Sequence, residues 1–154
     1  MNKTQQKFES VFNLLINLKE SYDTSTEYQK EFLSTIVGAA IYYLPTNKLT
    51  FSGKISQKAL ELPKNKRVKE HEYPRKIVGK ILLDTTPNSV DELKTLYHTK
   101  YGVWNLVTKE ENTRLRKFQK EGVFVSPEIS YQLAEIILMK NEVNGVKLLS
   151  YIPI

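Results

Sequence analysis

Hydrophobic residues three and four positions apart predict two helices at the start of the chain. The first helix is expected over residues 3–22, where the apolar residues that share one face are Phe8, Val11, Phe12, Leu15 and Leu18. Asp23-Thr24-Ser25-Thr26 then interrupts the pattern and offers an N-cap for a second helix, which Pro45 ends. The residues expected on the inward side of that second helix are Phe32, Ile36, Val37, Ala40 and Tyr43.

The rest of the chain alternates short strand and helix patterns. Residues 51–54 resemble a turn, and Ser56 can cap a short helix through Leu60. Strands are predicted over residues 67–70 and 103–107. The second range is rich in β-branched and aromatic residues. Helices are predicted over residues 74–83, 89–100, 108–120 and 126–139, and a closing strand over residues 146–152.

These elements predict an α+β fold that is predominantly helical. The chain has 154 residues, 40% of them hydrophobic, which is enough for a single domain with its own core. We expect three consecutive parts within residues 1–154: a helical part over 1–62, a central part over 63–122, and a last helix and strand over 123–154.

Composition excludes several classes of protein. The sequence contains no cysteine, which rules out disulfides, cysteine-ligated zinc and thiol catalysis. No apolar run approaches the roughly 20 residues that span a bilayer, and residues 1–6 lack the apolar core of a signal peptide. A cytoplasmic protein without a membrane partner is therefore expected.

Basic residues gather in two groups. The formal net charge is +6, which favours polyanionic partners through counterion release. The first group lies between Lys64 and Lys80, and the second lies in the helix predicted over 108–120. The candidates for contacts with nucleic acid are Lys66, Arg67, Lys69, Lys76, Arg114 and Lys117.

A short motif lies between the two basic groups. Its first part is Glu70-His71-Glu72-Tyr73-Pro74-Arg75, and its second part is Asn105-Leu106 followed by Asn112 at the start of the next predicted helix. Residues 67–120, about a third of the chain, resemble the His-Asn-Asn variant of the HNH (ββα-metal) nucleases. The resemblance implies a small β-hairpin followed by a helix, here with a helical insertion, as the core of residues 63–122.

The resemblance also implies a role for each motif residue. His71 would be the general base that activates water, since an imidazole can accept a proton near neutral pH. Glu70 and Asn112 would be ligands of one divalent metal, and their oxygen donors suit Mg²⁺ or Mn²⁺. Asn105 would fix the histidine by a bond to backbone across the hairpin loop, and Arg75 would hold a phosphate oxygen. Two departures from the pattern are Glu in place of the usual Asp at position 70 and the long interval from His71 to Asn105.

The sequence therefore predicts a metal-dependent endonuclease that hydrolyses phosphodiester bonds, with DNA favoured over RNA as substrate. The excess of lysine over arginine suggests an AT-rich genome, which fits a phage, restriction or mobile-element origin. Sequence specificity could come from the helices around the site, from a homodimer or from a partner. Three alternatives stay open: a non-catalytic nucleic-acid-binding or regulatory protein, a helical module that docks an acidic partner, and a ribonuclease. Each motif residue also has an ordinary explanation, since a histidine in a basic segment is often simply exposed to solvent.

Overall fold

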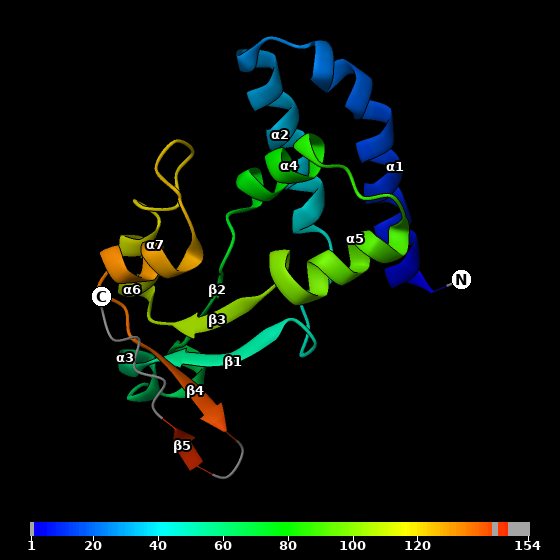
Figure 1. The fold of residues 1–154 in the computed structure, drawn as a ribbon. Helices are drawn as coiled ribbons and strands as arrows, with labels where there is room; N and C mark the ends of the chain where they lie inside the picture. Colours follow the sequence, from blue (N-terminus) through cyan, green and yellow to red (C-terminus); the bar gives the residue numbers. More distant parts are fainter. Residues whose placement is uncertain (1, 143–144, 148–154) are drawn as a thin grey trace. The chain divides into compact units, whose positions relative to one another are not determined.

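The computed structural model describes residues 2–142 and 145–147, and it divides the chain into two compact units. Unit 1 contains Met1–Leu49 and Tyr73–Gly102, and unit 2 contains Thr50–Glu72 and Val103–Ile154. Unit 1 is built from helices, and unit 2 contains the sheet (Figure 1). The expected α+β class with a high helical content is therefore confirmed. The predicted boundaries at 62 and 122 do not coincide with those of the units, because each unit is built from two separate stretches of chain.

Unit 1 consists of helices packed around one apolar cluster. Its elements are α1 (Lys3–Thr24), α2 (Glu27–Tyr42), α4 (Arg75–Asp84), α5 (Val90–Leu96) and a π-helical segment (Tyr97–Tyr101). The buried face of α1 contains Phe8, Val11 and Leu15, as the sequence predicts. The helix predicted over residues 89–100 is confirmed as α5, which continues into the π-helical segment at its C-terminal end.

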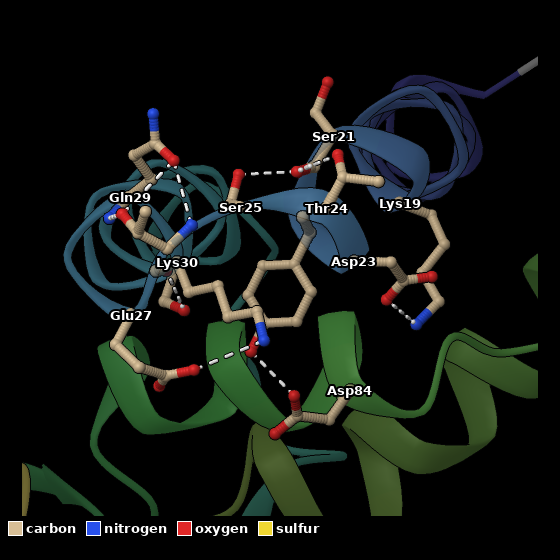
Figure 2. A network of polar contacts seen from close by, with 12 residues as sticks. Lys19, Ser21, Asp23, Thr24, Ser25, Glu27, Gln29, Lys30 and Asp84 are labelled. Carbon is tan, nitrogen blue, oxygen red and sulfur yellow. Dashed lines mark hydrogen bonds and ion pairs between the residues drawn. The ribbon is translucent and has the colours of Figure 1, made fainter.

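Polar contacts close the turn between α1 and α2 and connect it to α4 (Figure 2). The Thr26 hydroxyl accepts from the backbone N–H of Gln29 at 3.3 Å, and the Gln29 side chain accepts from the N–H of Thr26 at 2.9 Å. This reciprocal capping box begins α2 at the position that the sequence predicts. The Tyr22 hydroxyl donates to the carboxylate of Asp84 at 2.6 Å, which connects the end of α1 to the end of α4.

The inward side of α2 differs from the prediction. Val37 is buried as expected, but Phe32 and Tyr43 are 63% and 69% exposed. The buried face also contains Gly38 and Ile41. The reason lies in the contact between α2 and α4, which is made by glycines. A methyl group on Gly79 would lie 2.4 Å from the carbonyl oxygen of Ser34, so only glycine permits this approach. The small residues therefore decide which face of α2 is covered, and the apolar side chains on the other face stay exposed.

Unit 2 contains the sheet and four short helical elements. In chain order, the strands and helical elements of unit 2 are β1 (Phe51–Ser56), α3 (Gln57–Leu60), a 3₁₀ turn (Lys64–Lys66), β2 (Val68–His71), β3 (Trp104–Val107), α6 (Lys109–Leu115), α7 (Pro127–Leu133), β4 (Leu138–Glu142) and β5 (Gly145–Lys147). Within the described residues the sheet has five strands in the order β2-β3-β1-β4-β5 (Figure 1). Only β1 and β3 run parallel; the other neighbouring pairs are antiparallel.

The sheet is larger than the hairpin that the sequence predicts, because two predictions were wrong. Residues 51–54, expected as a turn, belong to β1, which lies between β3 and β4 and is stabilised by ladder bonds to both. Gly53, the residue that suggested the turn, has a φ of 78° inside the strand, where the register between β1 and β3 shifts. Pairing with sequence-distant strands thus outweighs the local turn preference.

The last predicted helix also ends early. It begins as expected with Ser126 as N-cap, but α7 ends at Leu133, and Glu135 takes a φ of 54° that a helix cannot continue. From Ile136 on, buried and exposed residues alternate into β4. The predicted extension of α6 to residue 120 is likewise wrong, since the helix ends at Leu115.

Two further predictions concern the C-terminus and the membrane. Of the closing strand predicted over residues 146–152, Val146 and Lys147 belong to β5, and residues 148–152 lie outside the described residues.

Within the described part of the chain, none of the helices combines the length and the apolar character needed to cross a membrane.

Candidate active site

Strands β2 and β3 and helix α6 form the hairpin-and-helix arrangement that the motif predicts. β2 is antiparallel to β3, with Glu70 opposite Asn105 and His71 opposite Trp104. One residue after β3, α6 begins and carries Asn112, and this helix contacts β2. The residues between the strands, 73–102, belong to unit 1. The long interval from His71 to Asn105 is therefore a helical insertion between two strands that pair directly.

A capping box determines where α6 begins. The Thr108 hydroxyl accepts from the N–H of Glu111 at 3.1 Å, and the carboxylate of Glu111 accepts from the N–H of Thr108 at 2.8 Å, so the helix begins where the sequence predicts it. The same carboxylate also accepts from the Ser56 hydroxyl at 2.5 Å, where Ser56 is the N-cap of α3. Glu111 is 2% exposed. It therefore anchors the first turn of α6 to the end of β1, one residue before Asn112.

Glu70 lies inside unit 2 with both carboxylate oxygens occupied. It is 3% exposed, its Oε2 accepts from the hydroxyl of Tyr131 on α7, and its Oε1 accepts from the side-chain amide of Gln119 at 2.5 Å. The Gln119 amide also donates to the backbone carbonyl of His71 at 3.4 Å. Residues that follow α6 in the sequence thus hold the strand that carries the motif.

Asn105 is completely buried and connects three side chains. Its Nδ2 donates to the Tyr131 hydroxyl at 2.7 Å and to Oε1 of Glu72 at 3.2 Å, and its Oδ1 accepts from the hydroxyl of Ser52 on β1. The structural role that the resemblance implies for Asn105 is consistent with these contacts, although they join side chains rather than a side chain and the backbone of a loop.

Several residues of this network were missed by reasoning from the sequence. Glu72 accepts from the Lys54 ammonium at 3.3 Å and from Nδ2 of Asn105 at 3.2 Å. The alternation of side chains along a strand places residues 70 and 72 on one face and could have identified Glu72. For Ser52, Lys54, Gln119 and Tyr131 the sequence carries no comparable signal. Ser52, Lys54 and Tyr131 come from segments outside the motif, and Gln119 follows the end of α6.

The other motif residues lie as follows. His71 ends β2 and is half-buried, and Asn112 is half-buried on α6. Arg75 begins α4 in unit 1, where its guanidinium lies 3.8 Å from the centre of the Tyr42 ring. Stacking on a ring uses the face of the guanidinium and leaves the N–H donors in its plane able to bind an anion. The phosphate contact predicted for Arg75 stays a prediction.

Both arginines among the candidates for nucleic-acid contacts have partners within unit 2. The Arg67 guanidinium donates to the carbonyls of Leu60 and Leu62, at 3.4 Å and 3.0 Å from Nη2, and Arg114 Nε donates to the carbonyl of Ala134 at 2.5 Å. These contacts hold loops in place. Lys66, Lys69 and Lys117 are exposed on unit 2, and Lys76 forms an ion pair of 2.7 Å with Glu31 in unit 1.

Burial is the main influence on the ionisation of Glu70. It raises the pKa of this carboxyl to about 7, with a smaller contribution from the charge of Glu72, while the hydrogen bonds from Tyr131 and Gln119 act in the opposite direction. Burial also raises the pKa of Tyr131, so its phenol stays protonated and can donate. The two groups that donate to Glu70 are neutral, and its ionised form is therefore buried without a directly paired cation.

We expect the stability of the metal-free protein to decrease between about pH 4.5 and pH 7. In this range folded Glu70 keeps a proton that the unfolded chain loses, so the free energy of unfolding falls as the pH rises, by about 3 kcal/mol in all. Urea denaturation in EDTA at several pH values measures this. Glu70→Gln should remove the decrease, and Glu61→Gln, at an exposed position, should keep it. Equal slopes in all three proteins would contradict the burial of an ionisable Glu70.

The binding of a divalent cation to Glu70 stays a prediction. A carboxylate has about four lone-pair positions, and the two hydrogen bonds leave some of them free. A cation would also compensate the buried negative charge, which neutral donors do only in part. Among the described residues no three His, Asp or Glu side chains gather as a metal-binding cluster, so Asn112 would have to complete the donor set.

Comparison with known proteins adds no relative to this picture. The chain matches no family model, and it shows no significant similarity to a curated protein or to a solved structure.

Proposed function

We propose that the chain is a metal-dependent endonuclease that hydrolyses phosphodiester bonds in DNA. The observation that carries the proposal is the pairing of Glu70 with Asn105 in adjacent antiparallel strands, with α6 directly after the second strand. The motif residues are separated by an insertion in the sequence. Their assembly into strand, strand and helix supports a resemblance that was drawn from residue identities alone.

Each motif residue of unit 2 would have one task in the reaction. His71 at the end of β2 would take the proton of the attacking water, while Glu70 and Asn112 would hold the cation, Mg²⁺ or Mn²⁺. When bound, that ion supplies positive charge near the scissile phosphate and the leaving oxygen. Asn105, buried at 0% exposure, would keep β3 in register with β2. Arg75 lies in unit 1, so the phosphate contact that the resemblance implies for it is not assigned to this site in unit 2.

The proposal includes a partner and a location. Lys66, Lys69 and Lys117 are the exposed basic residues of unit 2 that would contact the phosphates of DNA. A cytoplasmic protein acting on DNA, as a monomer or a homodimer, would fit this chemistry.

Cleavage of supercoiled plasmid tests the proposal. The purified protein is incubated with plasmid and Mg²⁺, Mn²⁺ or excess EDTA, and nicked and linear products are quantified over time. We expect nicking with either metal and none with EDTA. A chain that binds the plasmid in a salt-dependent way but leaves it intact under all conditions would be a non-catalytic binding protein. If a labelled RNA is cleaved and DNA is not, the substrate class of the proposal is wrong.

A further inference from the structure

Tyr131 lies at the meeting point of the two motif strands. Its hydroxyl donates to Oε2 of Glu70 on β2 and accepts from Nδ2 of Asn105 on β3, at 2.7 Å in the second case. The phenol comes from α7, outside the hairpin and helix that the motif defines. One hydroxyl therefore contacts the proposed metal ligand and the residue proposed to hold the strands in register.

These contacts are made in a closed environment. Tyr131 is 6% exposed, Asn105 is 0% exposed and Glu70 is 3% exposed. Hydrogen bonds in such surroundings are directional and costly to lose, because water does not replace the missing partner. The amide of Gln119 holds the other oxygen of Glu70, at 2.5 Å, so rotation of the carboxylate is restrained from both sides.

We infer that Tyr131 is a positioning residue, which orients the carboxylate of Glu70 and the amide of Asn105 for metal binding and phosphodiester hydrolysis. The inference rests on the proposed function and extends it, since it makes α7 part of the site. Groups that hold metal ligands by hydrogen bonds typically contribute 10-fold to 100-fold to metal affinity or activity.

Tyr131→Phe tests this inference, because it removes the hydroxyl and keeps the ring in place. The matched control is Tyr97→Phe in unit 1, which also removes a buried hydroxyl, one that donates to the carbonyl of Leu44 at 3.4 Å. Three quantities are compared with those of the wild type: the side-chain amide resonance of Asn105 in EDTA, the dissociation constant of Mn²⁺ from titration calorimetry, and kcat and KM for plasmid cleavage.

In Tyr131→Phe we expect a shifted Asn105 resonance, Mn²⁺ binding that is 10-fold to 100-fold weaker, and a kcat lowered by a similar factor with KM for plasmid unchanged. In Tyr97→Phe all three should equal the wild-type values, even if thermal stability falls in both variants. A purely structural role would lower stability without this separation of kcat from KM.

The outcomes separate the inference from the proposed function. Wild-type cleavage and Mn²⁺ binding that Tyr131→Phe leaves unchanged would overturn the positioning role and leave the nuclease standing. A wild type that binds Mn²⁺ without cleaving, with weaker binding in Tyr131→Phe, would support the positioning of Glu70 and overturn the nuclease. A wild type that neither binds Mn²⁺ nor cleaves would overturn both.

Discussion

Replacement of His71 by alanine is expected to lower the rate of metal-dependent plasmid cleavage by about 10³-fold. A general base contributes roughly 10²-fold to 10⁴-fold to a hydrolytic rate, and the sequence offers no second histidine near the motif that could replace it. The fold should survive, since His71 is a half-buried residue at the last position of β2. Initial rates of nicking at saturating Mn²⁺ measure the effect, and added imidazole should restore part of the rate.

His98→Ala is the matched control for this experiment. It removes the only other histidine, whose ring packs against Phe8 and Tyr97 in unit 1. We expect some loss of thermal stability and a cleavage rate close to that of the wild type. A similar fall in rate for both variants would mean that loss of packing explains the effect, and an unchanged rate in His71→Ala would remove His71 from the mechanism.

Local signals predicted the beginnings of helices well. Thr26, Ser56, Thr108 and Ser126 all serve as N-caps in the structure, because a cap depends on one side chain and a backbone group three residues away. Helix ends and strand partners were predicted less well. Whether residues 51–54 form a turn or a strand depends on β3 and β4, which are distant in the sequence.

The candidate site shows the same division between local and distant information. The motif located Glu70 and Asn105, and the strands place them opposite each other. Their side-chain partners could not be predicted, because Tyr131 lies on α7 and Gln119 follows α6, and where these residues lie depends on tertiary packing. The motif also could not show that Glu70 is buried, a property that depends on everything packed around β2.

Gly79→Ala is expected to destabilise unit 1 by about 2 kcal/mol. The added methyl group would lie 2.4 Å from the carbonyl oxygen of Ser34, a backbone atom that can move away only if α2 and α4 separate. Overpacking of this kind costs about 1–3 kcal/mol or more, and it outweighs the gain of about 1 kcal/mol that alanine brings to a helix interior. The expected fall in melting temperature is roughly 8–16 °C, measured by the helical circular dichroism signal.

Two further variants decide whether the contact between the helices is the cause. A methyl group on Gly38 would lie 2.9 Å from the carbonyl oxygen of Arg75, so Gly38→Ala should destabilise the unit less than Gly79→Ala does. Lys80→Ala, the next position on α4, brings alanine without a new contact and should change stability by less than about 0.5 kcal/mol. If Gly79→Ala melted at or above the wild-type temperature, the close packing of α2 on α4 would be refuted. The exposure of Phe32 and Tyr43 would then need another cause, because a wider separation of the helices would leave room to turn the apolar face of α2 inward.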